Sequence, residues 1–329
     1  MDSMAYGVDL GWVSQLEGRG VTWVDEKFQT KDPVELAKEL GANAVRLRIF
    51  VDPPKAGFWE KPDHTTCMLG FCDAESVLAM SQRVKALGMD LMLDFHYSDH
   101  FADPMYQHIP NAWLEEDENG LVKRVYKHTK EVLTLFAQNG IVPKWVQVGN
   151  EINTGILLPA GSSKDHPAGL VRMLNAGYDA VKECCPDTIV ITHAAGFVGW
   201  DVCSFYDRFF ENGGKTDLLG LSYYPYWYQK EHDGEVLKKE FEKLLDCYHL
   251  PVMIVEIGGL ENEEEETYHL LSDTIRVLKE LPKEAGKGIF YWEPEVGAAL
   301  LPDHYPLGAA KVVGENVLQY TKALSAYRN

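Results

Sequence analysis

The sequence predicts a single α/β domain, a (β/α)8 TIM barrel spanning residues 1–329. Three observations indicate this class: eight short apolar runs alternate with helical patterns, polar or aromatic side chains follow the runs, and no repeat or low-complexity linker divides the chain. Alternating strands and helices are typical of a parallel sheet, and eight such units close into a barrel. Because barrels of about 250 residues or more are single domains, 329 residues do not require two domains.

The apolar runs are short enough to be strands buried on both faces of a parallel sheet. The predicted strands are Tyr6–Leu10, Ala44–Ile49, Leu91–Phe95, Trp145–Val148, Ile189–Thr192, Leu218–Leu221, Val252–Val255 and Ile289–Tyr291. Between the runs, apolar residues recur with helical spacing. The clearest predicted helices are Val34–Leu40, Ala74–Leu87, Val125–Ala137, Gly169–Val181, Val236–Leu245 and Tyr268–Leu281.

The composition is strongly acidic, with 50 Asp and Glu against 31 Lys and Arg and a net charge of −19. Such a chain is a poor candidate for binding the phosphate backbone of nucleic acids or an anionic membrane surface. The sequence also has no run of about 18 apolar residues that could cross a bilayer. We therefore expect neither nucleic acid nor a membrane as a partner.

The N-terminus and the cysteines bear on the compartment. The first residues, MDSMAYGVDLGW, have no basic region and no apolar region of a signal peptide, so either the protein stays inside the cell or a signal was removed. The six cysteines are scattered, with Cys184 directly before Cys185. This spacing predicts reduced thiols rather than a disulfide framework, which mildly favours a reducing compartment.

A polar or aromatic side chain stands at the end of every predicted strand. In chain order these residues are Asp9, Arg48, His96, Glu151, His193, Tyr224, Glu256 and Trp292. In this fold the loops that follow the strands build the active site. These side chains are therefore expected at one rim of the barrel, where the chemistry takes place.

Two of these rim residues are glutamates, Glu151 after the fourth strand and Glu256 after the seventh. A lone glutamate at a strand end is more often a salt-bridge partner than a catalyst, but two at one rim favour a catalytic pair. Paired carboxylates suit glycoside hydrolysis, where one carboxyl donates a proton and the other attacks the anomeric carbon. A separation of about 5–5.5 Å would give retention of configuration.

Arginines on the second predicted strand could set the charge state of the pair. Arg46 and Arg48 share parity and both point into the barrel. We expect Arg48, nearer the mouth, to hold Glu256 ionised and to lower its pKa, so that Glu151 carries the raised pKa of the pair. Arg46 lies deeper, where a buried pair with Asp9 or Asp94 is as plausible as a functional role.

Other inward-facing polar residues are candidates for contacts in the cleft. Tyr224 shares parity with Ser222, whereas Tyr223 points the other way, so Tyr224 is expected to hydrogen-bond the nucleophile. His96 is either a satisfied core histidine or a residue of the site, and its place at a strand end favours the site. Asp9 is included among the expected substrate contacts.

Aromatic residues in the predicted loops offer flat apolar faces to sugar rings. Trp113, Trp227 and Trp292 are the candidates for such stacking, and each could equally be a loop or core anchor. Other chemistries lack their motifs: the sequence has no G-x-S-x-G, H-E-x-x-H, G-x-x-x-x-G-K-[ST] or C-x-x-C. The acidic run at 261–266 is typical of a solvated segment rather than a cation site, so no metal is predicted.

Taken together, the motifs resemble the retaining glycosidases of clan GH-A, and more closely glycoside hydrolase family 53, the endo-β-1,4-galactanases. The resemblance runs from Val8 to Pro294 and is strongest where the motifs are longest. The segments that carry it are GVDLGWVSQLE, VRLRIFVDP, LDFHYSDHFADP, IPNAW, VQVGNEINTGIL, RMLNAG, LGLSYYPYW, VMIVEI and FYWEP.

The resemblance implies that Glu151 is the acid/base, that Glu256 is the nucleophile, and that Asn150 binds the sugar 2-hydroxyl. It implies β-1,4-galactan of type I arabinogalactan as the substrate, an extracellular or cell-surface location, and no cofactor. We expect a monomer. Some members of that family bind calcium in an Asp-rich loop after the seventh strand, but the loop here is short and Glu-rich, so calcium is not expected.

The sequence also departs from the family pattern. Phe101 stands where a tryptophan is usual, Met105–Tyr106 replace a small and a basic residue, and Ile257–Gly259 replace an aromatic–proline stretch. These changes leave open the length and linkage of the substrate and whether chain ends or internal bonds are cut. The alternatives are another clan GH-A β-glycanase, such as a mannanase or glucanase, and a non-catalytic carbohydrate-binding barrel.

Overall fold

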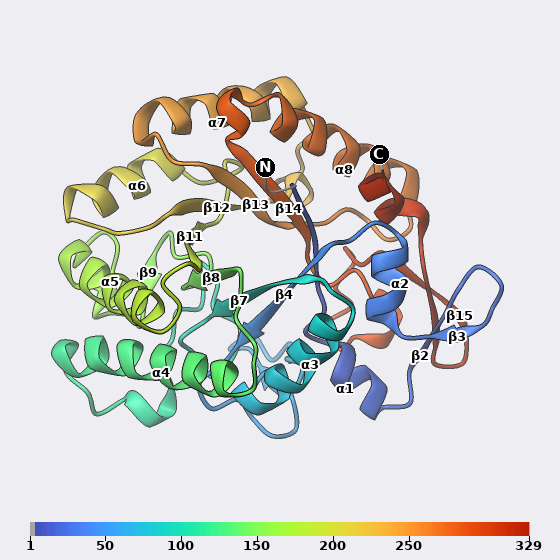
Figure 1. The fold of residues 1–329 in the computed structure, drawn as a ribbon, viewed down its shortest axis with the longest axis horizontal. Helices are drawn as coiled ribbons and strands as arrows, with labels where there is room; N and C mark the ends of the chain where they lie inside the picture. Colours follow the sequence, from blue (N-terminus) through green and yellow to red (C-terminus); the bar gives the residue numbers. More distant parts are fainter. Residues whose placement is uncertain (1–3, 329) are drawn as a thin grey trace.

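Eight parallel strands close into a barrel in the order β1-β14-β13-β12-β11-β8-β7-β4 (Figure 1). The computed structural model describes residues 4–328, so Met1–Ser3 and Asn329 of the predicted domain lie outside the described residues. The barrel strands are β1 (Ala5–Asp9), β4 (Ala44–Ile49), β7 (Asp90–Phe95), β8 (Trp145–Val148), β11 (Ile189–Ala194), β12 (Leu218–Tyr223), β13 (Val252–Ile257) and β14 (Gly286–Tyr291). The (β/α)8 fold and all eight predicted strands are confirmed.

Helices surround the barrel, as Figure 1 shows. Their bounds are α1 (Val13–Gly18), α2 (Pro33–Glu39), α3 (Ala74–Ala86), α4 (Glu118–Gln138), α5 (Pro167–Cys184), α6 (Val202–Glu211), α7 (Gly234–Tyr248) and α8 (Glu264–Glu280). The six predicted helices are confirmed, whereas α1 and α6 were not predicted. Asp32 and Asp73 begin α2 and α3 because their carboxylates accept backbone N–H groups of the first turn.

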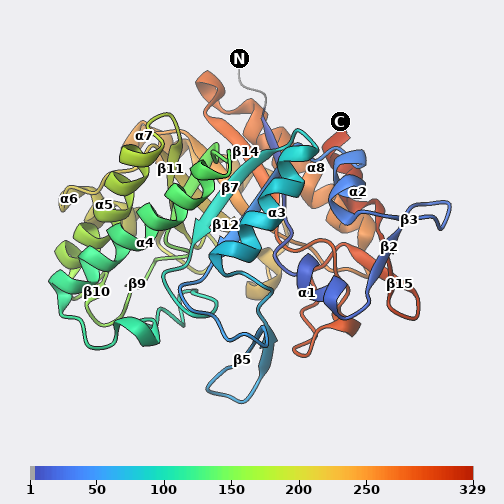
Figure 2. The same cartoon turned by 60° about the horizontal axis from the view of Figure 1, so that its bottom comes forward.

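Short elements in the loops extend the barrel. The small strands are β2 (Thr22–Val24), β3 (Thr30–Lys31), β5 (Phe58–Glu60), β6 (Thr66–Met68), β9 (Gly155–Ile156), β10 (Gly161–Ser162), β15 (Ala310–Gly314) and β16 (Val317–Tyr320). The 3-10 turns are Asn111–Trp113, Pro225–Tyr228, Pro282–Glu284, Ala298–Leu300 and Lys322–Arg328. β2, β3, β15 and β16 form one sheet that joins the two ends of the chain. Figure 2 shows the β5–β6 hairpin standing out from the rest of the fold.

The core has two parts. A large apolar cluster includes Val45, Leu93 and Phe136 and lies between the strands and the surrounding helices. A smaller cluster holds strand residues that alternate with the first and fills the barrel interior, with Met92, Phe290 and their neighbours fully buried. The polar rim residues therefore stand on a dry apolar layer.

The state of the cysteines and the polarity of the helices bear on the environment of the protein. All six cysteines are free, as their spacing predicts. Among residues 4–328, every helix is too short or too polar to cross a lipid bilayer.

We predict that Phe290→Ala lowers the free energy of unfolding by about 3–5 kcal/mol, because truncating a buried phenylalanine leaves a cavity. The Phe290 ring packs over Gly7, where an added Cβ would lie 2.0 Å from the ring, so the neighbouring strand offers no side chain to refill the space. Chemical denaturation measures the effect. Phe28→Ala is the control, since Phe28 is 67% exposed, and should change the value by less than about 0.5 kcal/mol.

Candidate active site

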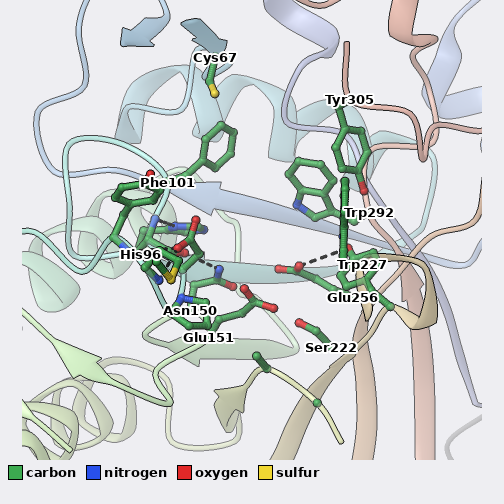
Figure 3. A pocket seen from close by; sticks show the side chains of 18 of the residues that line it. Cys67, His96, Phe101, Asn150, Glu151, Ser222, Trp227, Glu256, Trp292 and Tyr305 are labelled. Carbon is green, nitrogen blue, oxygen red and sulfur yellow. Dashed lines mark hydrogen bonds between the residues drawn. The ribbon is translucent and has the colours of Figure 1, made fainter. Parts of the chain in front are cut away.

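A cavity of about 670 Å³ opens at the carboxyl ends of the barrel strands (Figure 3). Its lining contains seven of the ten residues predicted for the site: His96, Asn150, Glu151, Tyr224, Trp227, Glu256 and Trp292. Figure 3 shows the carboxyl groups of Glu151 and Glu256 pointing into the same space from different strands. The structure therefore brings the two predicted carboxylates together. The other three predicted residues, Asp9, Arg48 and Trp113, do not line the cavity.

The two carboxylate oxygens of Glu256 have different partners. Its Oε1 lies 2.9 Å from Arg46 Nη2, and its Oε2 accepts a hydrogen bond of 3.3 Å from the Tyr224 hydroxyl. A bulge between β12 and β13 pairs Glu256 with Ser222, which sets the direction of the side chain. The expected hydrogen bond from Tyr224 is confirmed.

The arginine that neutralises Glu256 is Arg46, so the prediction of Arg48 for this contact is wrong. Arg48 instead forms an ion pair with Glu293 and donates to the carbonyl oxygen of Leu69 at 2.7 Å. The long Arg46 side chain reaches Glu256 from the deeper layer, whereas the Arg48 guanidinium is engaged by the Leu69 carbonyl and the Glu293 carboxylate. Its guanidinium also lies 4.9 Å from the centre of the Phe101 ring.

The sequence left open whether Arg46 forms a buried ion pair with Asp9 or with Asp94, and the structure shows that it forms both. Its Nη1 lies 2.6 Å from Asp9 Oδ2 and its Nη2 lies 2.8 Å from Asp94 Oδ2. Asp9 is therefore a structural partner of Arg46. The prediction that it contacts substrate is wrong, because its carboxylate is paired with Arg46 and it does not line the cavity.

The two glutamates differ in their environments. Burial and the charge of Glu256 raise the pKa of Glu151 well above its usual range. Burial also raises the pKa of Glu256, to about 6, although Arg46 opposes the shift. The expected order of the pair holds, but the expected depression of the Glu256 pKa is wrong, because the cost of burying the carboxylate exceeds the attraction of Arg46.

The backbone at Glu151 is unusual. Its φ is +45°, in the left-handed region that residues other than glycine seldom adopt. Its N–H donates to His193 Nδ1 at 3.3 Å, and the Ser222 hydroxyl lies beside its carboxyl. Such strained residues cluster at functional sites, where the surrounding structure holds them in place.

Asn150 and His96 are held by the protein on several sides. The Asn150 side-chain oxygen accepts from Arg46 at 2.8 Å, and its amide donates to the carbonyl oxygen of Ala102 at 2.8 Å. Within residues 4–328 the second amide hydrogen has no acceptor and is free for a ligand. His96 Nδ1 accepts the Ala102 N–H at 2.9 Å, while Nε2 lies 2.9 Å from Asp94. Burial lowers the pKa of His96, so the ring is neutral and donates from Nε2.

The three predicted tryptophans have different outcomes. Trp292 and Trp227 line the cavity, and Trp227 is 49% exposed. Trp113 lies in a 3-10 turn, is 4% exposed and packs edge-on against the ring of His128 on α4. It does not line the cavity, so its predicted contact with substrate is wrong. Its apolar surface is used to anchor the loop to α4.

Further cavity residues were not predicted as site residues. They include Trp12, Phe101, Trp200 and Tyr305. Trp292 packs edge-to-face with Trp12 and Tyr305 at ring distances of 5.1 and 4.7 Å, which builds an aromatic wall. Single aromatic residues carry no sequence signal of the direction in which their side chains point.

A second pair of glutamates, Glu293 and Glu295, is fully buried behind this wall. Glu293 accepts the N–H groups of Gly11 and Trp12, both at 2.9 Å. Burial and the charge of Glu293 raise the pKa of Glu295 well above its usual range, so Glu295 is neutral. The motif FYWEP contains Glu293, but nothing in the sequence distinguishes this structural role from a catalytic one.

The acidic segment after β13 does not fit a calcium ion. The Glu261 carboxylate accepts the N–H of Ala298 at 2.7 Å, and Glu265 forms an ion pair with Lys322. These carboxylates are turned to different partners, whereas calcium needs several oxygens that converge. Among residues 4–328 no group of three or more His, Cys, Asp or Glu side chains could hold a metal ion.

A parallel eight-stranded barrel with glutamates at the ends of its fourth and seventh strands, facing one aromatic cleft, defines the class of barrel glycoside hydrolases. The comparisons with known proteins identify the family. The family model described as "Glycosyl hydrolase family 53" matches residues 5–326, and the chain belongs to this family.

Relatives and solved structures agree. The arabinogalactan endo-beta-1,4-galactanase of Cellvibrio japonicus is 31% identical, covering 88% of this chain and 79% of that protein. The probable arabinogalactan endo-beta-1,4-galactanase A of Aspergillus terreus is 30% identical, covering 88% and 84%. The structure titled "Ignisphaera aggregans GH53 catalytic domain" superposes with a TM-score of 0.85 at 26% identity, covering 99% of this chain and 95% of that one.

We predict that Tyr224→Phe shifts the acidic limb of the pH–activity profile upward by about half a unit to one unit. The hydroxyl stabilises the ionised form of Glu256, so its loss raises the pKa of that carboxyl. Tyr223→Phe is the matched control, because the Tyr223 hydroxyl contacts His232 instead. An unchanged acidic limb in Tyr224→Phe would show that this hydrogen bond does not act on the titrating carboxyl.

Proposed function

We propose that this protein hydrolyses β-1,4-galactosidic bonds of galactan and type I arabinogalactan with retention of configuration. One observation carries the proposal: Glu151 and Glu256 face the same space, and their surroundings separate their pKa values in the order that an acid and a nucleophile require. Membership of family 53 and the printed names of the galactanase relatives support the choice of substrate.

In the first step, ionised Glu256 attacks the anomeric carbon while protonated Glu151 gives its proton to the leaving oxygen. Arg46 and Tyr224 hold the two oxygens of Glu256 and fix its approach. The products are a covalent glycosyl–enzyme ester and a sugar chain with a new reducing end. In the second step, Glu151 removes a proton from water, and the water oxygen releases the sugar from Glu256 with a second inversion at that carbon.

The free amide hydrogen of Asn150 is suited to the sugar 2-hydroxyl, a contact expected to strengthen in the transition state. His96 would contact substrate through its ring edge, since both of its nitrogens are engaged. Trp292 and Trp227 supply stacking surfaces. Arg48 acts indirectly, by holding Glu293 and the ring of Phe101.

The substrate is tested by measuring reducing sugar released from β-1,4-galactan, β-mannan and β-glucan. We expect strong preference for galactan. Preference for mannan or glucan would replace the proposal by another clan GH-A glycanase, because the same carboxylate pair serves all three. Absence of turnover on every polysaccharide would favour a carbohydrate-binding barrel, although such a module has no need of an acid and nucleophile pair.

The polymeric substrate also bears on location and assembly. Because a long polysaccharide does not cross a membrane, we propose that the enzyme acts outside the cell or at its surface, with a cytoplasmic role on imported oligosaccharides as the alternative. We also propose a monomer, because one chain supplies both glutamates and the residues that hold Glu256.

Glu256→Ala should lower activity by several orders of magnitude in a folded protein, because covalent catalysis loses its nucleophile. Azide should restore part of the activity and give a glycosyl azide of inverted configuration, since a small anion fits the vacated space. Steady-state kinetics and NMR of the product measure both effects. Glu263→Ala, at an exposed residue after the same strand, is the control. Near-normal turnover in Glu256→Ala would contradict the assignment.

Glu151→Ala should slow the hydrolysis of galactan far more than that of activated aryl galactosides, because only the poor leaving group needs a proton. In the unmodified enzyme the pH–activity profile should be bell-shaped. The acidic limb reflects ionisation of Glu256 near pH 6, and the basic limb reflects deprotonation of Glu151 at higher pH. Equal losses on both substrates, or a basic limb unchanged in Glu151→Ala, would leave Glu151 a structural role only.

Trp227→Ala should weaken binding of long galactan about tenfold, corresponding to about 1.4 kcal/mol, because a stacking face is lost at the cavity. Its half-exposed position means that the melting temperature should change little. Titration with oligosaccharides and calorimetric unfolding measure the two quantities. Tyr226→Ala is the matched control, since Tyr226 is 41% exposed and does not line the cavity. Lost stability with unchanged affinity would make Trp227 a loop anchor.

A further inference from the structure

One end of the cleft is bounded by two segments that are far apart in the sequence. The β5–β6 hairpin contributes Lys61, Thr65 and Cys67 to the lining, and the segment after β14 contributes Asp303, Tyr305 and Pro306. Both segments line the same cavity, and the Asp303 carboxyl lies near the Cys67 thiol. Burial and this carboxyl raise the pKa of the thiol to about 12. In Figure 3, Cys67 lies beyond Phe101, on the far side of that ring from the two catalytic glutamates.

The hairpin is fixed at its base. Gln15, a buried residue of α1, donates to the carbonyl oxygen of Gly57 at 3.0 Å and accepts the N–H of Gly70 at 2.8 Å. The Trp12 indole N–H donates to the carbonyl oxygen of Met68 at 2.7 Å. Buried hydrogen bonds therefore hold both ends of the hairpin against the barrel, which fixes the position of its base.

The order of the barrel strands shows which end this is. Glu151 follows β8, and the strand opposite β8 in the closed ring is β14, whose neighbour is β1 and then β4. The Asp303 segment follows β14, opposite β8. The hairpin follows β4, which is opposite β12 and two strands from β8, and it lines the cavity together with the Asp303 segment. The end of the cleft that the two segments bound together therefore lies across the barrel from Glu151. An acid/base residue stands beside the leaving oxygen, so the opposite side receives the part of the substrate that becomes attached to Glu256.

We infer that the β5–β6 hairpin and the 303–306 segment form a barrier that limits how many sugar units bind on the glycone side of the cut bond, and so fixes the length of the fragment released from that side. This inference rests on the proposed function and deepens it. On the opposite side, the loops after β11 and β12 bring Trp200 and the 40% exposed Tyr228 to the cavity, a surface suited to a longer leaving chain.

The barrier carries polar groups suited to sugar hydroxyls. Lys61 brings an ammonium group to the cavity, and Asp303 Oδ1 has no hydrogen-bond partner among residues 4–328. A buried acceptor without a partner is costly, and a hydroxyl of the last glycone unit would satisfy it. Lys61 and Asp303 are therefore the specificity-determining residues that we assign to the end of the glycone site.

The first experiment uses β-1,4-galacto-oligosaccharides of increasing length, labelled at the reducing end. The unmodified enzyme should release an unlabelled fragment of one constant short length, while the labelled fragment grows with the substrate. Unlabelled fragments of many lengths would contradict the inference that the barrier fixes the fragment length. If no oligosaccharide and no galactan were cleaved, the proposed function would fail, and this inference with it.

The second experiment shortens the barrier. Glu60 and Thr66 pair directly across the hairpin, so replacing Lys61–Thr65 by Asn-Gly should close it with a two-residue turn. This variant should release longer unlabelled fragments. An unchanged pattern in a variant with a normal melting temperature would overturn the inference.

Point variants keep the test independent of the folding of the shortened hairpin. Lys61→Ala and Asp303→Asn should each raise KM for oligosaccharides that reach the barrier about fivefold, the effect of one lost hydrogen bond, with kcat near normal. Glu60→Ala is the matched control, because Glu60 is exposed on the same hairpin and does not line the cavity. KM unchanged in both variants would remove Lys61 and Asp303 from the glycone site.

Discussion

The buried guanidinium of Arg46 is the interaction on which the site depends. It contacts Asp9 on β1, Asp94 on β7, Asn150 after β8 and Glu256 on β13, and so joins strands on different sides of the barrel. A buried arginine without partners would be strongly destabilising, but a guanidinium offers five donors in a fixed plane and can satisfy several carboxylates at once. The position of the nucleophile follows from this arrangement.

The position of Arg46 also explains why Glu151 and Glu256 have different roles in the reaction. The apolar layer that contains Met92 and Phe290 closes the barrel below Arg46 and keeps water from the charges above it. Burial raises the pKa of both glutamates, and Arg46 opposes the shift in both, but only Glu256 forms an ion pair with Arg46. An acid and a nucleophile of the same residue type are thus distinguished by which of them the single arginine touches.

Much of this could be predicted from the sequence, and the exceptions have physical causes. Strands in a closed parallel barrel are apolar on both faces, so each of the eight gave a clear signal, and both strand-end glutamates followed from their positions. The arginine contact was misassigned because parity gives the face of a strand but not how far a long side chain reaches. Strands as short as Thr30–Lys31 contain too few residues to show a period of two. The direction of the Trp113 side chain depends on packing against His128 of the following helix, α4, which the sequence pattern does not reveal.

Arg46 and Arg48 stabilise different parts of the site. Arg46 sets the charge and position of Glu256, whereas Arg48 binds Glu293 and the Leu69 carbonyl and lies against the rings of Trp12 and Phe101. Glu293 in turn accepts the Trp12 N–H, and the indole of Trp12 holds the end of the β5–β6 hairpin. The catalytic centre and the wall of the cleft therefore rest on separate buried ion pairs. Because of this separation, the loops that determine which sugars bind can change without disturbing the carboxylates that cut them.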